Sequence, residues 1–187
     1  MVYRPAFRTQ LDGSRCAGTN CGCASQAMAS QRGRRGRDPG NSHGWPPMPP
    51  EIRNYIGACG GTSLNQNDAA SNHLYAADMW VRYGVPWATF QSLIISGRGA
   101  IVQIWYGVIA PTRYDACPGF VKGHAVFVNE RNPATGAFLV YDPLANGRRG
   151  LPQGPQWWPA SLLKAAAYAF PGTATGCVNA SFTADTE

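Results

Sequence analysis

Hydrophobic residues recur at helical spacing just after position 20, which predicts the first regular element of the chain. Ala24, Ala27 and Met28 would share one face of a helix, and Asn20 is a residue type that commonly caps a helix N-terminus. A short helix over residues 21–31 is therefore expected, beginning at or beside Cys21.

Three more helices follow from the same kind of pattern. Gly60-Gly61-Thr62 leads into a segment with a broad apolar face, which should stay helical until Gly84. A third helix is expected from Pro86-Trp87 to Ser96-Gly97, and a final one over residues 159–170.

Runs of β-branched and aromatic residues predict strands in the second half of the chain. The run over residues 100–109 is one. Two more are expected at residues 124–128 and 137–141, joined by a polar link that is typical of a hairpin, and Pro143 ends the second. Helices followed by antiparallel strands predict an α+β fold.

The remaining segments are rich in glycine, proline and small polar residues. Residues 32–50 read as a long irregular loop, and residues 171–187 as a C-terminal tail. With 187 residues, no repeats and no second break of this kind, the chain is expected to form a single domain over residues 1–187.

The charge balance narrows the choice of partners. Net charge is +6, but only 14% of residues are charged, against a typical ~25%, which favours a surface partly covered by other subunits. Arginines 32, 34, 35 and 37 form a basic loop that is either solvated or contacts a polyanion. No nucleic-acid-binding motif accompanies it.

Cysteine content and hydropathy exclude several classes of protein. Six cysteines are too few for a disulfide scaffold at this length, although they leave room for one or two disulfides, and Cys21-Gly22-Cys23 lacks the spacing of a zinc pair. The N-terminus has no apolar run, and the stretch near residues 101–110 is too short to span a membrane. We expect no secretory signal and no membrane span, and hence a cytoplasmic protein unless another setting applies.

Two residue types suggest nucleophilic chemistry. A reactive cysteine needs a lowered pKa, a nearby base and hydrogen-bond donors for the oxyanion. Cys21 stands where a helix N-terminus would lower the pKa of its thiol. Among the three histidines, His124 begins a strand and would project from the rim of the sheet. His73 lies mid-helix and His43 in the proline-rich loop.

Asp142 ends the strand that follows His124 along the chain. If the two strands pair as a hairpin, Asp142 and His124 lie at the same end of the sheet, where the carboxylate can fix the imidazole tautomer. The other interpretation is that Asp142-Pro143 only opens a turn.

Four segments resemble the signatures of bacteriocin-leader-processing peptidases, which belong to the papain-like clan. They are Gln10, Cys21-Gly22-Cys23-Ala24-Ser25, Gly123-His124-Ala125-Val126 and Tyr141-Asp142-Pro143-Leu144, within residues 7 to 170. The resemblance implies a papain-like fold, with N-terminal helices packed on a C-terminal antiparallel sheet.

The same resemblance implies a role for each residue. Cys21 would be the nucleophile, His124 the base, Asp142 the orienting carboxylate and Gln10 an oxyanion donor, with no cofactor. In the family the glutamine lies six positions before the cysteine, a spacing that Gln10 has to Cys16. Either residues 15–19 are an insertion or Cys16 is the nucleophile; the helical pattern after Cys21 favours Cys21.

A second set of segments is similar to peptidase-like proteins of tailed phages of actinobacteria, which are often tail-associated. The set comprises Gln10-Leu11-Asp12-Gly13-Ser14, Gly60-Gly61-Thr62, Gly97-Arg98-Gly99-Ala100, the segment at His124 and Trp157-Trp158-Pro159. This implies a virion setting, in a phage tail, with other virion subunits as partners.

Two functions fit these observations. One is a thiol hydrolase that cleaves a peptide or isopeptide bond, or a cell-wall peptide in a groove lined by Trp157 and Trp158. The other is a structural tail protein that uses the same fold with idle or decayed catalytic residues, in which case the tryptophans serve packing.

Overall fold

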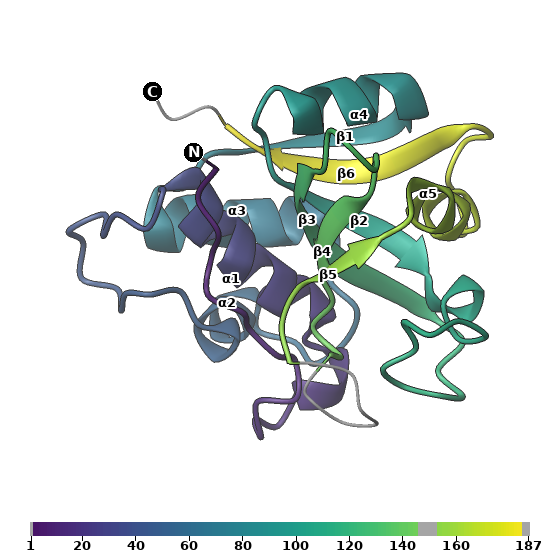
Figure 1. The fold of residues 1–187 in the computed structure, drawn as a ribbon. Coiled ribbons are helices and arrows are strands. Elements are labelled where there is room, and N and C mark those ends of the chain that lie inside the picture. Colours follow the sequence, from purple (N-terminus) through teal and green to yellow (C-terminus); the bar gives the residue numbers. More distant parts are fainter. Residues whose placement is uncertain (1, 146–152, 185–187) are drawn as a thin grey trace.

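A six-stranded antiparallel sheet organises the chain (Figure 1). The computed structural model describes residues 2–145 and 153–184. The strands lie in the order β1-β6-β2-β3-β4-β5, with the bounds Met79–Pro86 (β1), Ala100–Trp105 (β2), Gly123–Arg131 (β3), Phe138–Tyr141 (β4), Gln156–Trp158 (β5) and Cys177–Thr183 (β6).

Helices cover both faces of this sheet (Figure 1). On one face lie α1 (Cys21–Gly33), α2 (Pro49–Ile56) and α3 (Leu64–Tyr75); on the other lie α4 (Trp87–Ile95) and α5 (Ala160–Tyr168). Two short 3-10 turns, η1 (Ala17–Thr19) and η2 (Tyr106–Val108), precede α1 and follow β2. The layers form an α+β fold, as the sequence predicts.

Side chains of β3 show how one strand serves two cores. Val126 and Val128 belong to the cluster shared with α4 and α5, whereas Ala125 and Phe127 belong to the cluster shared with α1. Successive residues of a strand point to opposite faces of its sheet, so the nearly continuous apolar run of β3 is buried on both sides.

The predicted second helix is wrong over its last third. Helix α3 ends at Tyr75, where Ala76 takes a left-handed conformation (φ 47°), and residues 79–86 form the edge strand β1. The apolar residues Met79 and Val81 alternate with the more exposed Trp80 and Arg82, which is the period of a strand rather than a helix.

The predicted C-terminal tail is also wrong. Residues 177–183 form β6, which lies between β1 and β2 and is buried over six of its seven residues. Its small and polar residues give little strand signal by themselves. The segment becomes a strand by pairing with β1 and β2, which come from distant parts of the chain. Residues 185–187 of the predicted tail lie outside the described residues.

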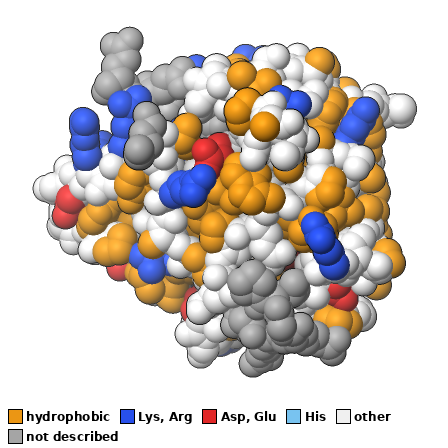
Figure 2. Space-filling model, in the orientation of Figure 1, with side chains coloured by type: hydrophobic (Ala, Val, Ile, Leu, Met, Phe, Trp, Pro, Cys, Tyr) orange, Lys and Arg blue, Asp and Glu red, His pale blue; other side chains and the backbone are white. Residues whose placement is uncertain are grey.

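The long loop at residues 32–50 is shorter than predicted at both ends. Helix α1 extends to Gly33, and Pro49 opens α2, which the sequence analysis missed. Arg32 belongs to α1 and is only 8% exposed, so it is not part of a solvated basic loop. On the face shown in Figure 2, Lys and Arg side chains are scattered among apolar ones.

None of the helices in the described ranges combines the length and the hydrophobicity that crossing a lipid bilayer demands.

Candidate active site

The thiol of Cys21 lies at the first residue of α1, as predicted. Asn20 precedes the helix but does not cap it with its side chain, which instead binds Asp12, Ser14 and Arg53. The N–H groups of the first turn are therefore not occupied by a capping side chain, and their partial positive charge favours an anion at Cys21.

Ser25 fixes α1 against the sheet one turn after Cys21. Its hydroxyl donates to the carbonyl of Ala125 at 3.1 Å, and both residues are buried. Residues four apart share one face of a helix, so this bond brings Cys21 beside the start of β3, where His124 lies.

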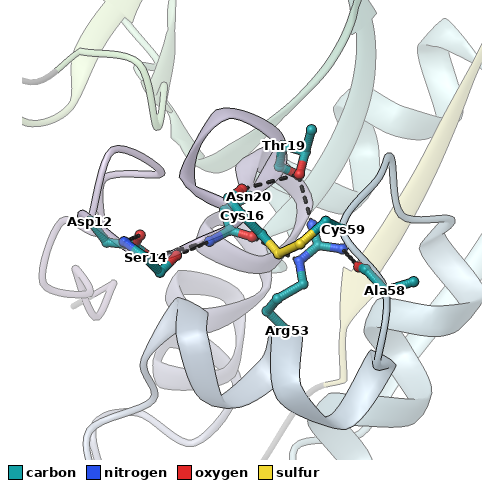
Figure 3. The surroundings of a disulfide bond; sticks show 8 residues. All are labelled: Asp12, Ser14, Cys16, Thr19, Asn20, Arg53, Ala58 and Cys59. Carbon is teal, nitrogen blue, oxygen red and sulfur yellow. Dashed lines mark hydrogen bonds between the residues drawn. A yellow bond between two sulfur atoms is a disulfide. The ribbon is translucent and has the colours of Figure 1, made fainter.

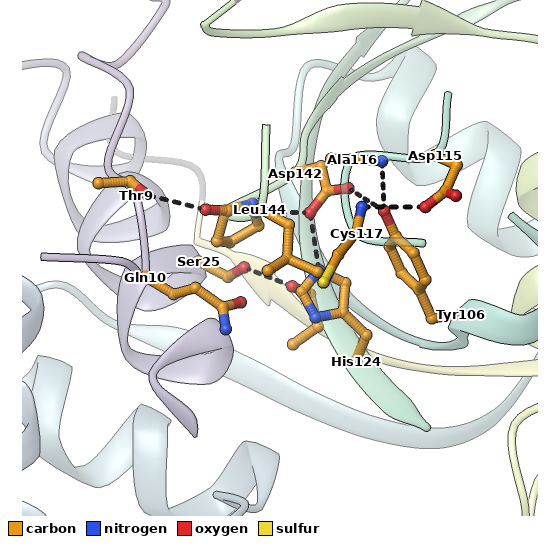
Figure 4. A network of polar contacts seen from close by, with 12 residues as sticks. Thr9, Gln10, Ser25, Tyr106, Asp115, Ala116, Cys117, His124, Asp142 and Leu144 are labelled. Carbon is orange, nitrogen blue, oxygen red and sulfur yellow. Dashed lines mark hydrogen bonds and ion pairs between the residues drawn. The ribbon is translucent and has the colours of Figure 1, made fainter. Parts of the chain in front are cut away.

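His124 and Asp142 meet at one end of the sheet (Figure 4). Strands β3 and β4 pair antiparallel, with Phe127 opposite Tyr141, so the start of β3 lies beside the end of β4. His124 Nε2 is 2.7 Å from Asp142 Oδ1, which also accepts the backbone N–H of Leu144 at 2.9 Å. The hairpin geometry predicted from the sequence is confirmed.

The second ring nitrogen of His124 is left for Cys21. Nδ1 is buried, no nitrogen or oxygen atom of the described residues hydrogen-bonds it, and the imidazole lies close enough to the Cys21 thiol for each group to shift the pKa of the other. Asp142 thus holds the ring by Nε2 and leaves Nδ1 unoccupied on a histidine that lines the same cleft as Cys21.

Electrostatics favour the charged forms of both groups. Burial alone would raise the pKa of Cys21, but the hydrogen bond and the charge of His124 outweigh it, and the pKa is lowered. Burial would lower the pKa of His124, but the charge and hydrogen bond of Asp142, followed by Cys21, raise it. A lowered thiol pKa and a raised imidazole pKa favour a thiolate–imidazolium pair.

A cleft of about 170 Å³ opens beside the sulfur. Its floor and walls are mostly glycine backbone and apolar side chains, so a substrate main chain can approach the sulfur closely. The lining residues are Cys21, Gly22, Gly61, Thr62, Gln103, Gly123, His124, Ala125 and Phe170.

Gln10 lies beside the segment that follows Asp142 and is not among the residues that line the cleft. Its backbone N–H donates to the carbonyl of Pro143, the residue after Asp142, at 3.1 Å, and its side chain is buried (Figure 4). One N–H of the side-chain amide donates weakly to the carbonyl of Gly18, at 3.4 Å. An amide has a second N–H, so Gln10 retains a donor.

The other cysteines differ clearly from Cys21. Cys16 forms a disulfide with Cys59 and is therefore not available as a nucleophile in this structure. Cys23 points into the α1–α3 core, where burial raises its pKa to about 11. Neither Trp157 nor Trp158 lines the cleft: Trp158 is in the core and Trp157 is 38% exposed.

Sequence reasoning missed Tyr106, which follows β2 and contacts both His124 and Asp142. Its ring meets that of His124 edge-on, with centroids 5.2 Å apart, and its hydroxyl lies 3.5 Å from Asp142 Oδ2 (Figure 4). A tyrosine at the end of an apolar strand carries no sequence signal for this role.

Comparison with known proteins identifies the fold. No protein-family model matches the chain, and no curated protein matches its sequence. A structure described as a C39-like peptidase from Bacillus anthracis superposes with a TM-score of 0.61 at 13% identity, over 100% of this chain and 98% of that one. The fold is papain-like.

A second papain-like structure agrees with this assignment. UfSP from C. elegans superposes with a TM-score of 0.51 at 14% identity, over 96% of this chain but only 33% of UfSP. At such identities the likeness establishes the fold alone.

Proposed function

We propose that this protein is a thiol hydrolase that cleaves a peptide or isopeptide bond. The observation that carries the proposal is the meeting of Cys21, His124 and Asp142, from three distant segments, beside one cleft. The papain-like fold supports it, because a cysteine at the start of the central helix is where such a fold can activate a thiol.

The proposed reaction begins with attack of the Cys21 thiolate on the carbonyl carbon of the scissile bond. The negative charge that develops on the carbonyl oxygen is accepted by the backbone N–H of Cys21 and by the remaining amide N–H of Gln10. As the carbon–nitrogen bond breaks, His124 gives its proton to the leaving amine, which leaves a thioester on Cys21.

Water completes the cycle. His124, now neutral, takes a proton from the water that attacks the thioester, and the acid product leaves as the thiolate–imidazolium pair of Cys21 and His124 is restored. Asp142 holds the imidazole by Nε2 throughout, so that Nδ1 stays directed at the reacting atoms.

Alkylation of the cysteines with iodoacetamide near pH 6, followed by mass mapping, tests the thiolate. We expect Cys21 to react first, because its lowered pKa keeps it ionised below the ordinary thiol range. The imidazolium persists above the ordinary histidine range, so the fast rate should extend from weakly acidic into alkaline pH.

Substitution gives the matched control for this experiment. In His124→Ala the thiol loses its charged partner, and alkylation of Cys21 at pH 6 should fall by roughly 100-fold. His73→Ala, on α3 outside the cleft, should leave the rate unchanged. If Cys21 reacts no faster than the half-buried thiol of Cys177, the thiolate does not exist.

Hydrolysis is the second measurement. A panel of fluorogenic peptides with small residues at the scissile bond should be cleaved by the parent protein and not by Cys21→Ala. A fast-labelling Cys21 without cleavage of any peptide would favour the other candidate, a structural protein with an idle site. The phage-tail setting rests on the sequence resemblance and fits either function.

A further inference from the structure

A second pocket lies near the cleft, and two arginines line it; Figure 3 shows one of them, Arg53, beside the Cys16–Cys59 disulfide. It has a volume of about 210 Å³ and lies between the segment before α1 and the end of α2. Its lining residues are Ser14, Arg15, Cys16, Pro50, Arg53, Asn54, Gly57, Ala58 and Cys59. Two of these are arginines, and none is a carboxylate.

Arg53 is a buried charge that only neutral groups hold. It is 5% exposed, and its guanidinium donates to Asn20 Oδ1 at 2.8 Å, to the carbonyl of Thr19 at 2.7 Å and to the carbonyl of Ala58. Within residues 2–145 and 153–184 it forms no ion pair. A buried charge without a counter-ion is costly, so an anion in the pocket would be stabilised.

One carboxylate reaches Arg53 only through another side chain. Asp12 accepts the amide of Asn20 at 3.2 Å and the N–H of Ser14 at 3.0 Å, while Asn20 turns its oxygen to Arg53. Asp12 therefore orients Asn20 toward the guanidinium without occupying the pocket.

Arg15 supplies the second positive charge and leaves it available. Its side chain is exposed, and no hydrogen bond or ion pair to the described part of the chain engages it. A guanidinium presents several N–H donors in a plane, which suits a carboxylate.

The segment that departs from the peptidase family's spacing builds this pocket. Residues 15–19, which lengthen the distance from Gln10 to the nucleophile, contribute Arg15, the disulfide half Cys16 and the Thr19 carbonyl. The Cys16–Cys59 disulfide joins the two walls (Figure 3). The pocket is thus a feature of this chain, and a resemblance to the family does not imply it.

The pocket lies near the cleft, because neighbouring stretches of chain contribute to both. Cys59 lines the pocket and Gly61 lines the cleft, while Asn20 holds Arg53 and is followed by Cys21. Two or three residues of extended chain span roughly 7–10 Å. An acidic group two or three residues from the scissile bond would therefore reach the arginines.

We propose that Arg15 and Arg53 form a subsite that binds a carboxylate of the peptide substrate, two or three residues from the bond that Cys21 attacks. The proposal rests on the proposed hydrolase function, which it deepens by naming acidic peptides as the substrate class. The carboxylate accepts hydrogen bonds from Arg15 and from the N–H groups of Arg53 that its three bonds to the protein leave over.

Binding to the Cys21→Ala variant tests the subsite without hydrolysis. Acetylated Gly-Gly-Glu amide should raise its thermal midpoint at constant ionic strength, and Gly-Gly-Gln amide should bind about tenfold more weakly, as expected when one charge-assisted hydrogen bond is lost. Comparing acetylated Gly-Gly-Gly as the free acid with the same peptide as the amide tests whether the pocket binds a C-terminal carboxylate as well as a side-chain carboxylate. Inorganic phosphate is the third probe.

Arg15→Glu, introduced into the Cys21→Ala variant, is the informative second substitution, since Arg53→Ala removes three hydrogen bonds of a buried guanidinium and can unfold the protein. It should abolish the preference for the acidic peptide, whereas Arg37→Glu, at an exposed arginine outside the pocket, should retain it. Equal binding of the Glu and Gln peptides overturns the proposal. So does stabilisation by phosphate alone, which would make the pocket a free-anion site.

The two proposals fail in different ways. Preferential binding of the acidic peptide together with a slow-labelling Cys21 would sustain the subsite and refute the hydrolase. Cleavage of neutral and acidic peptides with equal kcat/KM would sustain the hydrolase and refute the subsite.

Discussion

Tyr106 connects the end of β2 to the carboxylate that holds His124. The backbone N–H of Ala116 donates to the Tyr106 hydroxyl at 2.8 Å, which directs the hydroxyl proton elsewhere, and Asp142 Oδ2 lies 3.5 Å away. Burial first, and then the charge of Asp142, raises the pKa of Tyr106, so the hydroxyl stays protonated and can only donate to that carboxylate. At the scale of single residues, Tyr106 is a positioning residue for Asp142.

Replacing this hydroxyl should weaken the site without unpacking it. Tyr106→Phe keeps the ring against His124, but frees one oxygen of Asp142 and leaves the Ala116 N–H without its acceptor. We expect alkylation of Cys21 at pH 6 to slow by about two- to tenfold, the range for one hydrogen bond. The rate at Cys177, in the same sample, is the internal reference.

Tyr114→Phe is the matched control for this change. Tyr114 lies in the same core cluster, and its hydroxyl donates to the carbonyl of Trp157 at 3.0 Å, away from Asp142. Tyr114→Phe should destabilise the protein about as much as Tyr106→Phe does, but it should leave the rate of Cys21 alkylation unchanged. If both variants slow Cys21 equally, Tyr106 only packs and does not position Asp142.

At the scale of elements, the start of α1 depends on a close approach by the loop before α3. A Cβ atom built on Gly22 would lie 2.0 Å from Thr62 Oγ1 and 2.7 Å from Asn67 Nδ2. Glycine at this position lets residues 61–62 lie against the first turn of α1, where they form one wall of the cleft.

Gly22→Ala should therefore push this loop away. We expect it to lower the free energy of unfolding by about 1–3 kcal/mol, the usual cost of overpacking, and to slow alkylation of Cys21. Urea denaturation measures the first effect. Gly61→Ala serves for comparison, because its new methyl would meet nothing within 4 Å; a Gly22→Ala variant as stable as that one would refute the close approach.

At the scale of the whole molecule, the last strand completes the sheet. Strand β6 pairs with β1 on one side and with β2 on the other, so a segment near the C-terminus lies between strands formed much earlier in the chain. The three fully buried residues Val178, Ala180 and Phe182 contribute to the larger core cluster.

Shortening the chain tests this arrangement. A protein that ends at Gly176 lacks β6 and should lose its cooperative unfolding transition, because β1 is left without a partner and the core is opened. A protein that ends at Ala184 keeps all of β6 and should unfold like the parent. Circular dichroism during thermal unfolding distinguishes them, and cooperative unfolding of the shorter chain would contradict the role of β6.

The sequence by itself determined the elements whose signals are local. The helix that begins at Cys21 follows from apolar spacing, and the hairpin that brings His124 and Asp142 to one end follows from two apolar runs and a polar link. Two strands that pair in a hairpin are neighbours in the chain, so the sequence alone predicts that His124 and Asp142 lie at the same end of the sheet.

Only the tertiary structure decided what depends on distant partners. Over residues 79–85 the sequence predicts a helix, and the alternating exposure of a strand appears only where the segment pairs with β6. Likewise, the disulfide to Cys59, 43 residues away, removes Cys16 as a candidate nucleophile. Arg53 is held by Asn20 and by the carbonyl of Thr19, which lie more than 30 residues earlier in the chain. Such contacts join residues far apart in sequence, and local periodicity carries no information about them.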